Sequence, residues 1–141
     1  MKKEYLLTIA ASLLIMLFLY ASISKIIHPK TLMHDMYNQP FPAWLAGIFV
    51  IAVPSVEVLI AMALIFDRTR MIGFCGSLLL MALFTGYTAS ILLHFFPRVP
   101  CGCGGVIRML SWPQHLVFNL FFLGVALAGI VILKKRHDLT R

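Results

Sequence analysis

The sequence predicts an all-α polytopic membrane protein, a bundle of four transmembrane helices that forms a single domain over residues 1–141. Of the 141 residues, 61% are hydrophobic and only 12% are charged, and the mean hydropathy is +0.95. A soluble domain of this size could not keep so much apolar surface away from water. Four apolar stretches are each long enough to span a bilayer, which takes about 20 residues as a helix.

The predicted spans are residues 6–24, 43–66, 71–95 and 116–133. The first, third and fourth contain no Asp, Glu, Lys or Arg, and the second contains only Glu57. The first span could also be a signal peptide, because Lys2 and Lys3 precede it and Ala21-Ser22 offers a small-residue cleavage site. Its apolar run is longer than the apolar region of a signal peptide, which usually has about 7–15 residues, and no A-x-A cleavage pattern follows. We therefore expect this span to be retained.

The basic residues predict the orientation of the bundle. With four spans, both termini and the 67–70 turn lie on one side, and that side carries eight of the twelve Lys and Arg residues: Lys2, Lys3, Arg68, Arg70, Lys134, Lys135, Arg136 and Arg141. The other side carries Lys25, Lys30, Arg98 and Arg108. The positive-inside rule places the termini in the cytoplasm, and the connections 28–42 and 96–114 then face outward, into the periplasm if the cell is Gram-negative. The net charge of +7 is explained by topology and anionic lipid, without nucleic acid.

The most informative motif is Cys101-Gly102-Cys103-Gly104-Gly105, in the outward connection between the last two spans. Disulfides persist in an oxidising compartment such as the periplasm. Cα atoms two residues apart are separated by about 5.5–7 Å, the upper part of the disulfide range. The central glycine supplies the dihedral angles that such a small ring needs. A strained disulfide is easily reduced and serves exchange better than stability, so Cys101 and Cys103 are the predicted catalytic pair.

The flank of this motif predicts an organised site. Ser111-Trp112-Pro113 is typical of a helix start, with proline in the first turn, where its missing N–H costs nothing. The positive end of that helix, together with Arg108, would favour thiolate over thiol if it lies near a sulfur. The third cysteine, Cys75, lies near the cytoplasmic end of its span, about 30 Å from the others across the bilayer. We expect it to be an inert packing residue.

Several segments together resemble the MauE/DoxX group of redox-associated membrane proteins. The resemblance rests on Pro100-Cys101-Gly102-Cys103-Gly104-Gly105, Ser111-Trp112, then His115 and Asn119, with Ser24-Lys25 closing the first span and Pro54 with Glu57 in the second. It implies a four-helix fold and a role in disulfide formation, as in methylamine utilisation, with a periplasmic thioredoxin-like partner. The wider group is likened to quinone-linked four-helix enzymes. This chain has no Cys-x-x-Cys pair and no second outer cysteine pair, which excludes an internal two-pair relay and leaves a quinone in doubt.

Ionisable residues inside the membrane are costly and usually functional. Glu57 lies about 20 Å below the outer end of its span at 1.5 Å per residue, one turn from Pro54, which allows a kink. It is either a proton-relay or cofactor contact, or a neutral carboxylic acid hydrogen-bonded to a neighbouring helix. Lys25, at the outer boundary of the first span, falls short of this depth even if its side chain snorkels. We therefore claim no direct Lys25–Glu57 pair.

The sequence favours an inner-membrane thiol–disulfide oxidoreductase that exchanges electrons with a periplasmic thioredoxin-like protein and needs no cofactor beyond its disulfide. Supporting roles fall to Gly102, Gly104, Gly105, Arg108, Trp112, His115, Asn119, Glu57 and Lys25. One alternative is binding or transfer of a metal (Cu, Zn or Hg) by Cys101, Cys103, His94 and His115. Another is a structural or quinone-contacting subunit of a respiratory complex. The direction of electron flow and the oligomeric state stay open.

Overall fold

A computed structural model describes residues 1–95 and 111–141 of the chain. Its helices are α1 (Lys2–Ile27), α2 (Pro29–Tyr37), α3 (Ala43–Ile65), α4 (Arg70–Leu92) and α5 (Trp112–Leu139). Four of them, α1, α3, α4 and α5, are long and apolar enough to cross a membrane. The predicted all-α fold with four membrane spans is therefore confirmed.

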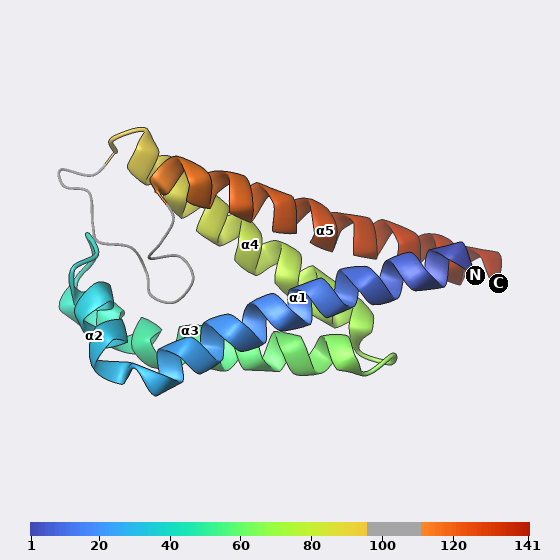
Figure 1. Cartoon of the computed structure of the whole chain (residues 1–141), viewed down its shortest axis with the longest axis horizontal. Coiled ribbons are helices and arrows are strands. Elements are labelled where there is room, and N and C mark those ends of the chain that lie inside the picture. Colours follow the sequence, from blue (N-terminus) through green and yellow to red (C-terminus); the bar gives the residue numbers. More distant parts are fainter. Residues whose placement is uncertain (96–110) are drawn as a thin grey trace.

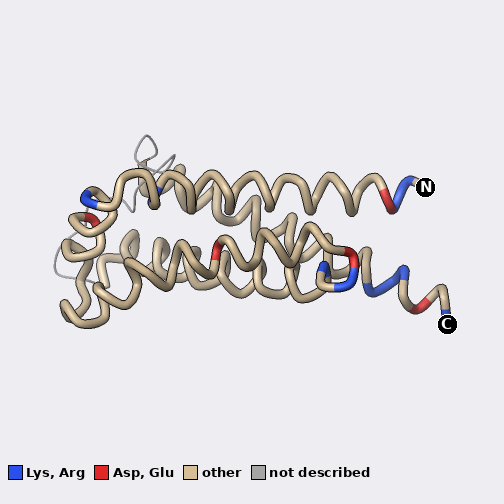
Figure 2. The backbone as a smooth tube through the Cα atoms, turned by 90° about the horizontal axis from the view of Figure 1, so that it is seen from below, with Lys and Arg blue, Asp and Glu red and all other residues tan. Residues whose placement is uncertain are grey.

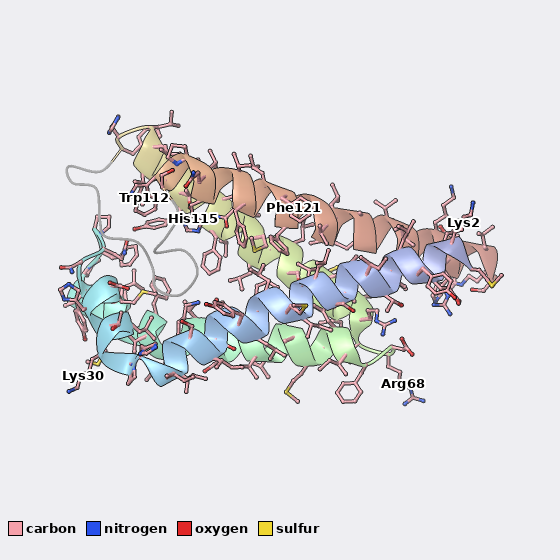
Figure 3. The ribbon with its side chains drawn as sticks, viewed as in Figure 1. Lys2, Lys30, Arg68, Trp112, His115 and Phe121 are labelled. Atoms are coloured by element: carbon pink, nitrogen blue, oxygen red, sulfur yellow. The ribbon has the colours of Figure 1, made fainter. Side chains whose placement is uncertain are left out.

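The four long helices form a ring in which α1 packs on α3, α3 on α4, α4 on α5, and α5 back on α1. Both termini lie at one end of the bundle, and α2 lies at the other (Figure 1). Figure 3 shows Lys2 and Arg68 toward the first end, and Lys30, Trp112 and His115 toward the second. We call these the termini end and the α2 end. Charged residues gather toward the two ends of the bundle and leave its length almost free of charge (Figure 2).

The turn between α3 and α4 is closed by side chains that satisfy the last carbonyl groups of α3. Thr69 donates its hydroxyl to the carbonyl of Ala63 at 2.9 Å, and Arg70 donates Nε to the carbonyl of Leu64 at 3.2 Å. Arg70 also pairs with Asp67 at 2.6 Å. Helix ends leave such carbonyl groups without partners inside the helix. The turn can therefore be short, and α4 returns directly along α3.

The apolar core fills the half of the bundle toward the termini end. Leu14 of α1, Leu64 of α3, Phe74 of α4 and Ala126 of α5 are all fully buried in one cluster. Glycines allow the closest approaches, because a Cβ at Gly129 would overlap the ring of Phe74. Without a strong hydrophobic force between helices in lipid, such small residues let the helices gain dispersion contacts instead.

Helix α2 lies in the connection 28–42, for which the sequence analysis assigned no helix. Pro29 occupies its first turn, where a proline is tolerated. Leu32 and Met36 are buried against Ala46 in the second turn of α3, with Phe49 and Val50 beside them. Helix α2 therefore covers the first turns of α3, which extend beyond the end of α1.

The long helices are staggered along the length of the bundle. At the termini end, α1 and α5 run past the α3–α4 turn (Figure 1), and Arg136 of α5 pairs with Glu4 of α1 there at 3.4 Å. At the other end, α3 runs past α1 and is covered by α2. The end of α1 is therefore not level with the start of α3.

Gly129→Ala should destabilise the bundle by about 1–3 kcal/mol, because the added methyl group is forced into the ring of Phe74. Gly124→Ala in the same helix is the matched control, since a Cβ there meets no atom within 4 Å. Both changes gain the same helix propensity, so their difference in thermal unfolding in detergent isolates the packing term. Equal melting temperatures for the two variants would show that the Gly129–Phe74 contact is not close.

Candidate functional site

The predicted catalytic segment falls outside the residues that the structure describes. This applies to Cys101, Gly102, Cys103, Gly104, Gly105 and Arg108. The structure does describe the two helix ends that this segment joins, the end of α4 and the start of α5.

Helix α4 ends at Leu92 in a motif built around His94. The backbone of His94 has φ 57°, a left-handed conformation that glycine usually adopts. The N–H of His94 donates to the carbonyl of Ile91, and the N–H of Phe95 donates to the carbonyl of Ser90, both at 3.1 Å. These are the two hydrogen bonds of a Schellman motif. His94 therefore stops α4 through its backbone, and its side chain is exposed.

Helix α5 begins with a capping box, which confirms the helix start predicted at Ser111-Trp112-Pro113. The Ser111 side chain accepts a hydrogen bond from the backbone N–H of Gln114 at 3.4 Å, and the Gln114 side chain accepts one from the N–H of Ser111 at 3.0 Å. This reciprocal pair satisfies two N–H groups that would otherwise be free. In the same first turn, the ring of Trp112 stacks on that of His115, with ring centroids 6.1 Å apart and planes inclined at 29°.

His115 and Asn119 lie one turn apart on the buried face of α5. Asn119 donates Nδ2 to the hydroxyl oxygen of Thr88 at 3.4 Å, and Thr88 donates to the carbonyl of Phe84 at 2.8 Å. Asn119 therefore makes a buried hydrogen bond between α5 and α4. This contact ties the second turn of α5 to the last turns of α4.

A second polar contact, which the sequence analysis missed, ties α4 to α2. Tyr87 donates its hydroxyl to Oε1 of Gln39, and Gln39 donates Nε2 to the backbone carbonyl of Asp35 at 3.0 Å. The ring of Tyr87 also lies against Phe41, with centroids 5.8 Å apart. Gln39 follows the end of α2 by two residues, so its bond to the Asp35 carbonyl fixes the side chain against that helix, where Tyr87 of α4 meets it.

Lys25 and Glu57 form a buried ion pair, so the estimate that Lys25 stops short of Glu57 was wrong. Lys25 Nζ lies 2.6 Å from Glu57 Oε1, and the two side chains are 6% and 1% exposed. The estimate assumed that α1 ends level with the start of α3. Because the two helices are staggered, the depths of the two residues match. Lys25 lies two residues before the end of α1, and it meets Glu57, which lies 14 positions after Ala43 at the start of α3.

The buried polar residues gather in one half of the bundle. Among the described residues they are Ser22, Lys25, Asp35, Gln39, Glu57, Ser77, Thr88, His115 and Asn119. All except Ser77 lie at or near the Lys25–Glu57 pair or farther toward the α2 end. Helix α4 ends and α5 begins at the α2 end (Figure 1), which is the end toward which these polar residues lie.

One further residue of the sequence analysis, the third cysteine, has a defined place. Cys75, one turn inside α4, has an exposed side chain, so the expectation that it packs inside the bundle was wrong. Within residues 1–95 and 111–141, no three His, Cys, Asp or Glu side chains are grouped to hold a metal. The alternative metal set includes two cysteines outside those ranges, so this observation does not test it.

Comparison with known families identifies the group to which the chain is related. A family model described as methylamine utilisation protein MauE matches residues 3–132. The chain belongs to the MauE family. The match covers α1 to α4, the cysteine segment and most of α5, and it supports the MauE part of the resemblance seen in the sequence. No curated protein and no solved structure shows a significant similarity to this MauE-family chain.

Lys25→Met should destabilise the bundle by up to about 3–5 kcal/mol, because it leaves the carboxyl group of Glu57 buried without its partner. Lys25→Met/Glu57→Leu should recover most of that loss, since neither buried charge of the pair then remains. Glu4→Gln, which breaks the exposed pair with Arg136, should cost about 0–1 kcal/mol. Unfolding in detergent measures all three variants. If Lys25→Met were as stable as Lys25→Met/Glu57→Leu, the Lys25–Glu57 pair would be contradicted.

Proposed function

We propose that this MauE-family protein is a thiol–disulfide exchange protein of the bacterial inner membrane, with its termini in the cytoplasm. Its Cys101/Cys103 pair exchanges electrons with a periplasmic thioredoxin-like protein, and the exchange supports the maturation of exported proteins in methylamine utilisation. The observation that carries the proposal is the Cys-Gly-Cys-Gly-Gly motif in a chain of this family.

The chemistry of the pair supports this role. A Cys101 or Cys103 thiolate attacks the disulfide of the partner, so that one S–S bond breaks and a mixed disulfide forms. The second cysteine of the chain then attacks the mixed disulfide and forms the Cys101–Cys103 disulfide. The partner leaves as a dithiol, having gained two electrons and two protons. The reverse sequence uses the same intermediate, and the relative reduction potentials decide the direction.

The surroundings of the segment also support the role. The segment begins after Phe95 and ends at Ser111, which caps α5. The N-terminus of a helix has a positive partial charge that stabilises a nearby thiolate. The disulfide is itself the redox group, so the exchange needs no other cofactor.

The direction of the bundle in the membrane can be tested with new cysteines at its two ends. In a Cys75→Ala/Cys101→Ala/Cys103→Ala background, Lys30→Cys at the α2 end should react with a membrane-impermeant maleimide added to spheroplasts. Arg68→Cys at the termini end should react only after the membrane is opened. Both positions are exposed and lie at opposite ends of the bundle (Figure 3). The expected result follows from the excess of Lys and Arg at the termini end, and the opposite labelling would refute the periplasmic placement.

The exchange itself can be trapped with single cysteine variants. Either Cys101→Ala or Cys103→Ala, but not both, should accumulate a covalent adduct with a thioredoxin-like protein, because the resolving thiol is then missing. Non-reducing electrophoresis and mass spectrometry of the band identify the adduct, which reduction should abolish.

Two controls accompany that experiment. Cys101→Ala/Cys103→Ala should form no adduct, and Cys75→Ala should behave as the unmodified chain, because Cys75 lies in the other half of α4. Full activity of both single variants in the host pathway would show that these cysteines are not the site. Stoichiometric Cu(I) or Zn binding that His94→Ala/His115→Ala abolishes, with no reversible disulfide, would support the metal alternative instead.

A further inference from the structure

The Lys25–Glu57 pair uses only half of the carboxyl group of Glu57. Oε1 accepts the hydrogen bond from Lys25 at 2.6 Å. Oε2 is buried and has no hydrogen-bond partner in the structure. A carboxylate has about four acceptor positions over its two oxygens, and a buried polar atom without a partner calls for an explanation such as a bound proton, water or ion.

The described neighbours of the pair on α1 and α3 provide no hydrogen-bond donor to Oε2. Along α3, Pro54 and Ile60 are buried one turn to either side of Glu57, and both are apolar. On α1, Ser22 is fully buried one turn from Lys25, but its hydroxyl donates to the carbonyl of Leu19 at 3.1 Å. A fixed structural ion pair in a dry interior is stable only when its remaining hydrogen-bonding positions are filled.

In the part of the chain that the structure describes, the other ionisable groups do not bond to Oε2 either. Helix α2 contributes Asp35, which is buried, and α4 contributes Tyr87, whose hydroxyl donates to Gln39. Helix α4 carries no Asp, Glu, Lys or Arg from Met71 to Leu92. On α5, His115 is buried and stacks on Trp112. None of these side chains, and no other side chain in residues 1–95 and 111–141, is bonded to Oε2, so this oxygen is able to accept a proton.

We propose that Glu57 Oε2 is a proton-exchange site inside the bundle, with Lys25 holding Oε1 in place. A proton from water that reaches the interior binds Oε2, the carboxylate becomes a carboxylic acid, and the donor is left as its conjugate base. Lys25 keeps its three protons, no electrons move, and the charge of the pair rises by one. Loss of the proton restores the neutral pair. This site does not depend on the proposed cysteine chemistry.

The polar half of the bundle gives this proton its direction of approach. From the pair toward the α2 end, the interior contains Gln39, Thr88, His115 and Asn119. Toward the termini end, the interior is the apolar core, which contains residues such as Leu14, Leu64 and Phe74. Water enters a polar interior far more readily than an apolar one, so exchange proceeds from the α2 end.

The composition of the chain allows a direct spectroscopic test, because it contains only two glutamates, Glu4 and Glu57. In a Glu4→Gln variant made with carboxyl-¹³C glutamate, every isotope-shifted carboxyl signal belongs to Glu57. Infrared difference spectra of this variant in lipid bilayers, recorded as the pH is lowered, should show a protonated carboxyl band that disappears reversibly when the pH is raised. The band should shift again in D₂O.

A second variant keeps the assignment independent of isotope labelling. Glu57→Gln should lose the band completely. If Glu57→Gln does not fold, the labelled Glu4→Gln variant decides alone, because its Lys25–Glu57 pair is intact. Absence of any isotope-shifted carboxyl band over the pH range in which the protein stays folded overturns the proposal. A water O–H band that depends on Glu57, without a carboxyl band, also overturns it and makes the pair a fixed, hydrated ion pair.

Discussion

A charge placed in the hydrocarbon region of a membrane must find a partner inside the protein, and Lys25 and Glu57, both buried, meet this requirement by pairing with each other. The pair fixes how α1 lies along α3, because both side chains must reach the same level. That alignment leaves the first turns of α3 uncovered by α1. Helix α2 covers them with Leu32 and Met36, so the position of α2 follows from the same constraint.

The pair also marks the boundary between two kinds of interior. On the side of the termini, apolar side chains and small residues pack closely, as Gly129 does on Phe74. On the side of α2, hydrogen bonds between helices replace part of that packing, as between Asn119 and Thr88. Hydrogen bonds between membrane helices are worth about 0.6–2 kcal/mol each, so this half is held by fewer, more directional contacts. A protein that exchanges thiols at the α2 end would place its chemistry over this polar half, away from the tightly packed core.

Parts of both the fold and the site were predictable from local sequence. The four spans follow from runs of apolar residues, and Ser111 with Gln114 is a local capping pattern that needs no tertiary information. Helix α2 was missed because it has nine residues, of which only Leu32, Asp35 and Met36 are buried. Its pattern is too short to separate from a loop. The bond from Tyr87 to Gln39 joins residues that are 48 positions apart, and no local pattern predicts such a contact.

The sequence by itself determined that the chain is a four-span membrane protein with a Cys-Gly-Cys segment between its last two spans, because composition and the length of apolar runs decide what can cross a bilayer. Its motifs also pointed to the MauE family, to which the chain belongs. Only the tertiary structure decided that Lys25 meets Glu57. Depth counted along each helix assumes that neighbouring helices start level, whereas their relative shift is set by packing and by the pairing of buried charges. The sequence of one helix contains no measure of that shift.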